Sequence, residues 1–166
     1  MRAKGAATFG AYAGVLDTDP AEYDKLIETL TINVSKFFRN PETFASIATK
    51  VLPELWATKS PMMRIWSAGC ATGEEPYSLA VLCREYALAV KDEARLENVR
   101  IVGSEVDRDA LSAASRGRYT ESAFVETAPA VREKYFPLDH GMYTVAPEIR
   151  SLVAFERRDL LDGGGP

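Results

Sequence analysis

The 166-residue sequence has little of what several large classes of protein require. One histidine and two cysteines are too few for a zinc cluster or a disulfide framework. The 20 basic and 24 acidic residues give a net charge of −4, whereas nucleic-acid-binding proteins usually carry a basic excess. No apolar run approaches the roughly 20 residues that span a bilayer. We therefore expect no metal site, no nucleic-acid partner and no membrane insertion.

The scarce residues also lack a catalytic setting. Cys70 lies in a glycine-containing loop and Cys83 on the apolar face of the next predicted helix, and both are interpreted as small buried thiols. His140 lies in a Leu-Asp-His-Gly turn, and no nucleophile elbow accompanies it. The N-terminal stretch has no leucine-rich core of a signal peptide, so we expect a cytoplasmic protein.

The chain divides by pattern into a helical segment, residues 1–58, and an α/β segment, residues 62–166. Apolar residues at helical spacing after Asp-Pro and Asn-Pro pairs predict helices over 20–30 and 41–56. Strands over 63–67 and 99–103 alternate with helices over 76–90 and 108–116, and this order predicts a parallel sheet with right-handed crossovers.

The following stretch, about 120–156, has a different pattern. A helix over 127–136 precedes two short segments with alternating faces, 142–145 and 153–157, which suggest a small antiparallel excursion. The predicted fold class is therefore α/β: an N-terminal helical segment, then a partial Rossmann-like sheet with a small inserted antiparallel β-subdomain.

The stretch MRIWSAGCATGEEPYSLA, residues 63–80, carries the chemistry. It predicts a strand, a loop from Gly69 to Gly73 that a ligand can approach closely, and a helix that begins with Glu74 and Glu75. These acids occupy a helix end that normally attracts anions, so they disfavour a pyrophosphate and favour a ligand with positive charge. Glu105, at the end of the next strand, is placed to accept hydrogen bonds from ribose hydroxyls. S-adenosylmethionine fits these features.

The motifs WSAGCATGEEPYSLA, GSEVDRDALSAASRGRY and LTINVSKFFRNPETF resemble the chemotaxis receptor methyltransferases (CheR type), which are S-adenosylmethionine-dependent protein-glutamate O-methyltransferases of the class I fold. YTVAPEIRSLVAFERRDLLD resembles the family's return from its β-subdomain into the sheet. The resemblance covers nearly the whole chain. It implies methyl transfer to glutamates in the cytoplasmic domain of chemoreceptors, with S-adenosylhomocysteine as the product.

The resemblance also implies a set of cofactor contacts. It adds residues from two parts of the chain to Gly69, Gly73, Glu75 and Glu105. In the family, Asp is more common at position 105 and Asn at position 159. The added residues are Asn33, Ser35, Arg39, Asp159 and Leu160.

The implied mechanism needs no general base, because an ionised glutamate carboxylate can attack the sulfonium methyl group in line. The enzyme then acts mainly by alignment and exclusion of water. Arg39 is the candidate catalytic residue, since its guanidinium can hold a carboxylate bidentately. The carboxylate could belong to the cofactor or to the substrate glutamate.

Compared with the family, the chain appears truncated at both ends. Family members have more N-terminal helices, and they continue with a further strand, an Asn-Val motif and a tyrosine near the reacting methyl. We therefore expect an unpaired apolar edge at the 63–67 strand, which favours aggregation, and weak or no turnover.

Two other interpretations remain open. The chain could be a non-catalytic signalling module that binds S-adenosylmethionine or a receptor tail, the latter by strand addition to the antiparallel subdomain. It could also be a methyltransferase for a small carboxylic acid.

Overall fold

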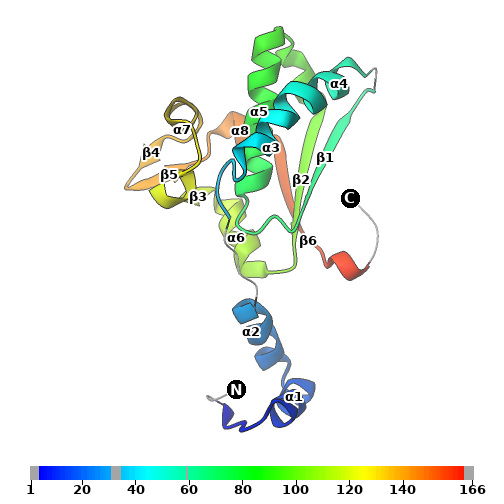
Figure 1. Ribbon diagram of the computed structural model, residues 1–166, viewed down its shortest axis with the longest axis vertical. Coiled ribbons are helices and arrows are strands. Elements are labelled where there is room, and N and C mark those ends of the chain that lie inside the picture. Colours follow the sequence, from blue (N-terminus) through cyan, green and yellow to red (C-terminus); the bar gives the residue numbers. More distant parts are fainter. Residues whose placement is uncertain (1–3, 31–34, 59, 163–166) are drawn as a thin grey trace. The chain divides into compact units, whose positions relative to one another are not determined.

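The structure is a computed structural model that describes residues 4–30, 35–58 and 60–162 (Figure 1). The chain divides into two units, Met1–Ile32 and Asn33–Pro166. The first unit contains α1 (Phe9–Thr18) and α2 (Pro20–Leu30), and the predicted helix over 20–30 is confirmed. The two helices are joined by a side-chain hydrogen bond, in which the Tyr12 hydroxyl donates to Glu22 Oε1 at 2.9 Å.

The predicted helix over 41–56 is present, but it is not a regular α-helix throughout. It consists of α3 (Pro41–Ser46), a π-helical turn η2 (Ile47–Val51) and α4 (Leu52–Ala57). Pro53 stands in the first turn of α4. Proline has no N–H to donate, and its ring would clash with a carbonyl four residues earlier in a regular helix. The wider π turn just before Pro53 accommodates this without ending the helix.

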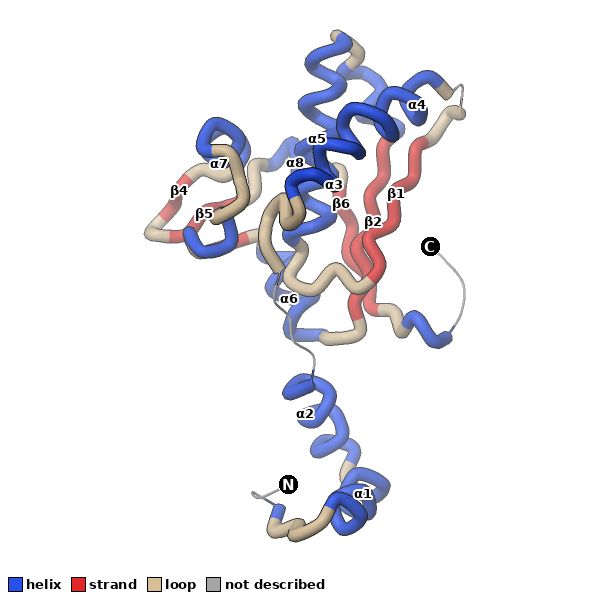
Figure 2. Tube along the Cα trace, viewed as in Figure 1, coloured by secondary structure: helices blue, strands red, loops and turns tan. Residues whose placement is uncertain are grey.

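A three-stranded parallel sheet lies at the centre of the second unit (Figure 2). The strand order is β1-β2-β6, with Met63 paired to Val99 and Ile101 to Val153. Helices connect the strands as the sequence predicts, so the α/β fold class is confirmed. The elements are β1 (Met63–Ala68), α5 (Glu74–Val90), η3 (Glu93–Asn98), β2 (Val99–Glu105), α6 (Arg108–Arg116) and β6 (Val153–Arg157).

One predicted pairing is wrong. The sequence analysis assigned the 153–157 strand to the antiparallel excursion, but β6 runs parallel to β2. Alternation of faces identifies a strand without identifying its partner, because the pairing depends on contacts far away in the sequence. Residues 153–157 thus complete the main sheet, and their carboxyl end lies beside that of β2.

A small antiparallel sheet is present and confirms the rest of that prediction. Its strand order is β3-β5-β4, and it forms a lobe beside α5 (Figure 1). His140 and Gly141, both at positive φ, make the turn between β4 and β5, as predicted for His140. The elements of this lobe are β3 (Arg118–Tyr119), η4 (Glu121–Phe124), α7 (Pro129–Tyr135), β4 (Leu138–Asp139), β5 (Met142–Thr144) and the connecting α8 (Pro147–Arg150).

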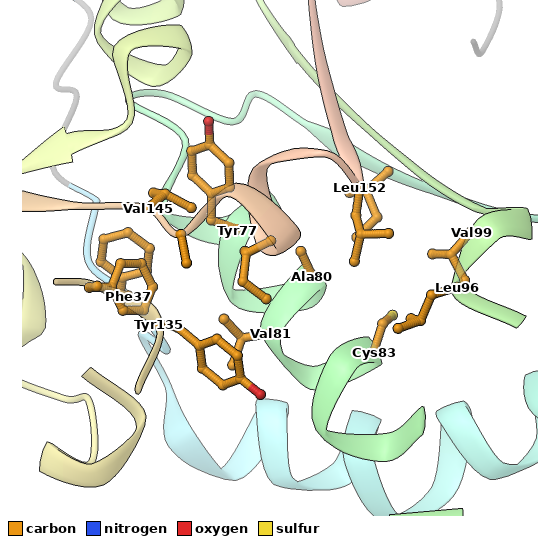
Figure 3. Packing of buried hydrophobic residues seen from close by; sticks show 14 of the residues in the cluster. Phe37, Tyr77, Ala80, Val81, Cys83, Leu96, Val99, Tyr135, Val145 and Leu152 are labelled. Carbon is orange, nitrogen blue, oxygen red and sulfur yellow. The ribbon is translucent and has the colours of Figure 1, made fainter. Parts of the chain in front are cut away.

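The core of the second unit extends from the sheet, along α5, into the antiparallel lobe (Figure 3). Phe37 is fully buried, stacks on Phe124 at a ring-centroid distance of 4.6 Å, and meets Tyr119 and Phe136 edge to face. Burial of one such aromatic side chain contributes about 1.5–3 kcal/mol. Phe37 therefore anchors the segment before α3 to the lobe.

β1 lies at an edge of the three-stranded sheet, as predicted. Met63 and Ser67 are buried on the side covered by α5, whereas Arg64 and Trp66 alternate with them and are exposed. Trp66 is 41% exposed, although its indole N–H donates to Ser104 Oγ at 2.8 Å. The edge therefore carries exposed apolar surface, which favours association with other strands.

Candidate functional site

The glycine loop, Gly69–Gly73, connects β1 to α5 at the carboxyl end of the sheet. The N–H groups of Gly69 and Cys70 donate to the carbonyl of Ser104 on the neighbouring strand, at 2.8 and 2.9 Å. Gly69 and Gly73 both have positive φ, 71° and 93°. A Cβ added to Gly69 would meet no atom within 4 Å, whereas one added to Gly73 would lie 2.9 Å from Ala114 Cβ. Gly69 thus leaves open space where a ligand could approach, and Gly73 permits close packing of α5 on α6.

The paired acids at the start of α5 have different environments. Glu74 is 4% exposed, and the Thr72 hydroxyl lies 2.7 and 2.9 Å from its two carboxylate oxygens. Glu75 is exposed, and its Oε1 accepts a hydrogen bond from the buried Ser67 hydroxyl at 2.7 Å. Both acids lie in the first turn of α5, as predicted. Only Glu75 combines solvent access with a side chain held toward the end of β1.

Glu105 lies at the end of β2 and is 9% exposed. Its Oε2 accepts from the N–H of Ala71 at 3.0 Å, and its Oε1 accepts from the N–H groups of Val106 at 2.8 Å and Asp107 at 3.3 Å. A carboxylate has about four acceptor positions, so about one remains on Oε2. Glu105 therefore holds the glycine loop against β2, a role that the sequence analysis did not foresee.

The segment that carries Ser35 and Arg39 is joined to the first helical turn of α5. The N–H of Phe38 donates to Ser78 Oγ at 3.0 Å. Ser78 is fully buried, and its hydroxyl donates to the carbonyl of Glu74 at 2.7 Å. The structure thus connects this segment with the glycine loop, although the two are remote in the sequence. Asn33, the remaining residue predicted for this segment, lies outside the described residues.

Asp159 and Leu160 follow β6 and lie at the same end of the sheet. The N–H of Arg158 donates to the carbonyl of Glu105 at 3.1 Å, which fixes the chain just before them. Both residues are exposed, and Asp159 Oδ1 accepts from the N–H of Leu161 at 2.9 Å. Asp159 thus caps the short helix η5 (Leu160–Asp162). Their predicted contact with the cofactor stays a prediction.

A pocket of about 400 Å³ lies between the glycine loop, the segment before α3 and the antiparallel lobe. Tyr119 in its wall donates from its hydroxyl to the carbonyl of Thr72 at 2.7 Å, and burial raises the pKa of this phenol. The polar and charged residues that line the pocket are Ser35, Lys36, Thr72, Glu74, Arg118, Tyr119, Thr120 and Ser122.

The two thiols are buried, as predicted, with exposures of 2% for Cys70 and 1% for Cys83. Burial, reinforced by the nearby Glu105 carboxylate, raises the pKa of Cys70 to about 12. Burial alone raises the pKa of Cys83 to about 12. Because the thiolate is the reactive form, both residues are suited to packing rather than to nucleophilic chemistry.

Comparison with protein families agrees with this arrangement. Residues 33–164 match the model of the CheR methyltransferase, SAM binding domain. The chain belongs to the CheR methyltransferase family. The match includes the strand-loop-helix unit, β2, the antiparallel lobe and β6, so the resemblance found in the sequence is confirmed. The family's domain binds S-adenosylmethionine, in agreement with the cofactor predicted from the glycine loop and its acids.

Individual CheR relatives are similar over most of the chain. A chemotaxis protein methyltransferase of Listeria monocytogenes is 32% identical over 154 residues, which cover 93% of this chain and 56% of the relative. Chemotaxis protein methyltransferase 2 of Pseudomonas aeruginosa is 35% identical over 160 residues, covering 93% and 54%. An uncharacterized 104.1 kDa protein of Rhodobacter capsulatus is 34% identical over 153 residues, covering 91% and 16%. The chain thus spans about half or less of these relatives.

No described helix is long and apolar enough to cross a membrane. No cluster of three or more metal-ligating side chains occurs among the described residues.

Three hydroxyl groups that connect the site were not expected from the sequence. Ser67 and Ser78 are buried and Thr72 is half-buried, and each would be unremarkable in a strand, loop or helix taken alone. A hydroxyl on the buried side of a predicted strand or helix must find a hydrogen-bond partner, and this was the available signal. Its partner, such as the N–H of Phe38, could not be read from the sequence.

Proposed function

We propose that this CheR chain serves S-adenosylmethionine-dependent methyl transfer to glutamate side chains in the cytoplasmic domain of chemoreceptors, giving glutamate methyl esters in chemotaxis or related signalling. The observation that carries the proposal is the hydrogen bond from Ala71 N–H to Glu105 Oε2, 3.0 Å long. It brings the glycine loop and the strand-end acid together at one edge of a parallel sheet, where ligands of such folds bind.

The residues at this edge fit the cofactor. Open space beside Gly69 lets an adenosine or amino-acid group approach the backbone. Glu105 retains acceptor capacity for one ribose hydroxyl, after its three backbone contacts. Glu75, with Oε1 held by Ser67, can present Oε2 to a hydroxyl or an ammonium group. When bound, S-adenosylmethionine supplies a methyl group activated by a sulfonium.

The remaining proposed contacts belong to segments on either side of this edge. Ser35 and Arg39 precede α3, and Asp159 and Leu160 follow β6. We assign Arg39 to a carboxylate, because a guanidinium binds one through two parallel hydrogen bonds. A substrate glutamate is already ionised at neutral pH, so the chain has to orient it and exclude water. This division of labour requires neither a histidine nor a reactive thiol.

The proposal is tested first by binding. Calorimetric titration of the 166-residue chain with S-adenosylhomocysteine should give saturable one-to-one binding, and Glu75→Ala should weaken it at least tenfold. Glu97→Ala is the matched control, because Glu97 is an exposed acid at the opposite end of β2 and should leave the affinity unchanged. A folded chain that does not bind S-adenosylhomocysteine would overturn the proposal.

The second test is transfer. The chain is incubated with methyl-labelled S-adenosylmethionine and a chemoreceptor cytoplasmic domain, and the labelled product is then treated with mild alkali. A glutamate methyl ester releases labelled methanol, whereas methyl groups on nitrogen or sulfur remain attached. Release of labelled methanol, even at a low rate, supports the proposal over the non-catalytic signalling module, because weak turnover is expected of this chain. Transfer to small carboxylic acids alone would favour the third interpretation.

A further inference from the structure

Two residues just before α3 adopt a backbone conformation that side chains disfavour. Phe38 has φ 56° and Asn40 has φ 64°, both in the left-handed region. Asparagine tolerates this region, whereas an aromatic residue such as Phe38 incurs about 1–2 kcal/mol unless its surroundings hold it. Arg39, the proposed carboxylate-binding residue, lies between them. Strained residues that persist next to functional side chains indicate that the surrounding contacts fix the conformation.

Those contacts come from two sides. On one side the N–H of Asn40 donates to Glu126 Oε2 at 3.1 Å, and the N–H of Phe37 donates to the carbonyl of Ala123 at 2.9 Å. These bonds attach the segment to the antiparallel lobe. On the other side the N–H of Phe38 donates to Ser78 Oγ at 3.0 Å, which attaches it to α5.

The Ser78 hydroxyl both donates and accepts a hydrogen bond in this arrangement. Its proton goes to the carbonyl of Glu74 at 2.7 Å, and its lone pair accepts the N–H of Phe38. The donation to Glu74 is the ordinary helical back-bond of serine to the residue four positions earlier, and it fixes the direction of the hydroxyl. Because Ser78 is 0% exposed, water cannot replace the lost acceptor if the hydroxyl is removed.

We infer that Ser78 is a positioning residue for Arg39. It holds the backbone of Phe38 in the left-handed conformation and so sets the direction in which the chain enters Arg39. This inference rests on the proposed function, because Arg39 is taken to bind a carboxylate of the cofactor or substrate. It gives the two cofactor-binding segments a direct physical connection through one hydroxyl.

The test is a double-mutant cycle on the affinity for S-adenosylhomocysteine, measured by calorimetry with the 166-residue chain. Ser78→Ala should weaken binding about tenfold, a change that corresponds to about 1.4 kcal/mol. In the Arg39→Ala background, Ser78→Ala should change the affinity by less than twofold, because its effect passes through Arg39. Ser78→Cys fills the site with a slightly larger group that is a weak acceptor, so it should also weaken binding. It is the second variant to measure where Ser78→Ala does not fold.

The matched control is Thr49→Ala, which removes a hydroxyl that makes the same helical back-bond, to the carbonyl of Ala45 at 2.8 Å. It should leave the affinity unchanged. Two results would overturn the inference: an equal loss of affinity from Ser78→Ala with and without Arg39, or no loss of affinity in a folded Ser78 variant. In either case, binding by the wild-type chain would leave the proposed function standing. Absence of wild-type binding would overturn both.

Discussion

The close approach at Gly73 allows a stability prediction that separates packing from backbone strain. A Cβ at this position would lie 2.9 Å from Ala114 Cβ and 3.1 Å from both Phe155 Cζ and Tyr119 Oη. Gly69, four residues earlier, has a similar positive φ but open space around it. An alanine at either position incurs about 1–2 kcal/mol for the left-handed backbone. Overpacking adds about 1–3 kcal/mol at Gly73 only.

Part of this cost is offset, because alanine restricts the unfolded chain and thereby favours folding by about 0.4–1 kcal/mol. We therefore expect Gly69→Ala to lower the free energy of unfolding by about 1 kcal/mol and Gly73→Ala by about 2–4 kcal/mol. Urea unfolding followed by tryptophan fluorescence measures both, since Trp56 and Trp66 lie in the unit Asn33–Pro166. Equal destabilisation by the two variants would refute the packing argument.

Three other expectations concern ionisable groups. Glu105→Asp keeps the charge but shortens the side chain that reaches the N–H of Ala71, so it should weaken the binding of S-adenosylhomocysteine. Equal or tighter binding in calorimetry would show that this contact with the glycine loop is dispensable. Because burial raises their pKa to about 12, Cys70 and Cys83 should resist a thiol reagent near pH 8 in the folded chain and react after denaturation, and rapid labelling of the folded chain would contradict this. Burial raises the pKa of Glu85, but hydrogen bonds, led by the one from Lys134, outweigh burial, so the net shift of the pKa is downward. The ionised Glu85 therefore stabilises the fold near neutral pH, and this stabilisation is lost as the carboxylate becomes protonated. Glu85→Gln should reduce the urea midpoint near neutral pH and have no effect well below pH 4.5, the unperturbed pKa. An equal reduction at both pH values would contradict the ion pair.

The fold was predictable where the controlling interactions are local. The strand, loop and helix of residues 63–90 follow from periodicity, two glycines and a proline in the first helical turn. The predicted helix over 108–116 is α6, and Asp107 directly before it caps it, because its Oδ1 accepts from the N–H groups of Asp109 and Ala110. The partner of β6 could not be inferred from its alternating faces, because parallel pairing joins residues about fifty positions apart, whereas the resemblance of this stretch to the family's return into the sheet correctly implied it. The π turn before Pro53 was missed, because the apolar spacing of the helix continues through it.

The site divides in the same way. Glu75 and Glu105 could be inferred from residue type and position at the ends of predicted elements, although the use of Glu105 by backbone N–H groups could not. Ser35 and Arg39 came only from the resemblance to CheR proteins. Nothing local distinguishes Arg39 from a solvated arginine, and the bond that joins its neighbour Phe38 to α5 comes from Ser78, forty residues after Phe38.

The hydrogen-bond donors around Glu75 and Glu105 explain why these acids at the ends of predicted elements could indicate the type of ligand from the sequence alone. Glu75 accepts from the Ser67 hydroxyl, and Glu105 accepts from backbone N–H groups. Neutral donors orient a carboxylate without bringing a positive charge to it. The carboxyl end of this sheet therefore keeps negative charge where phosphate-binding folds offer a bare helix end. Coulomb repulsion across a few ångströms disfavours a pyrophosphate there, and the same field attracts a sulfonium or an ammonium group. Selection by charge thus adds to the shape selection of the glycine loop, and together they favour S-adenosylmethionine over a dinucleotide.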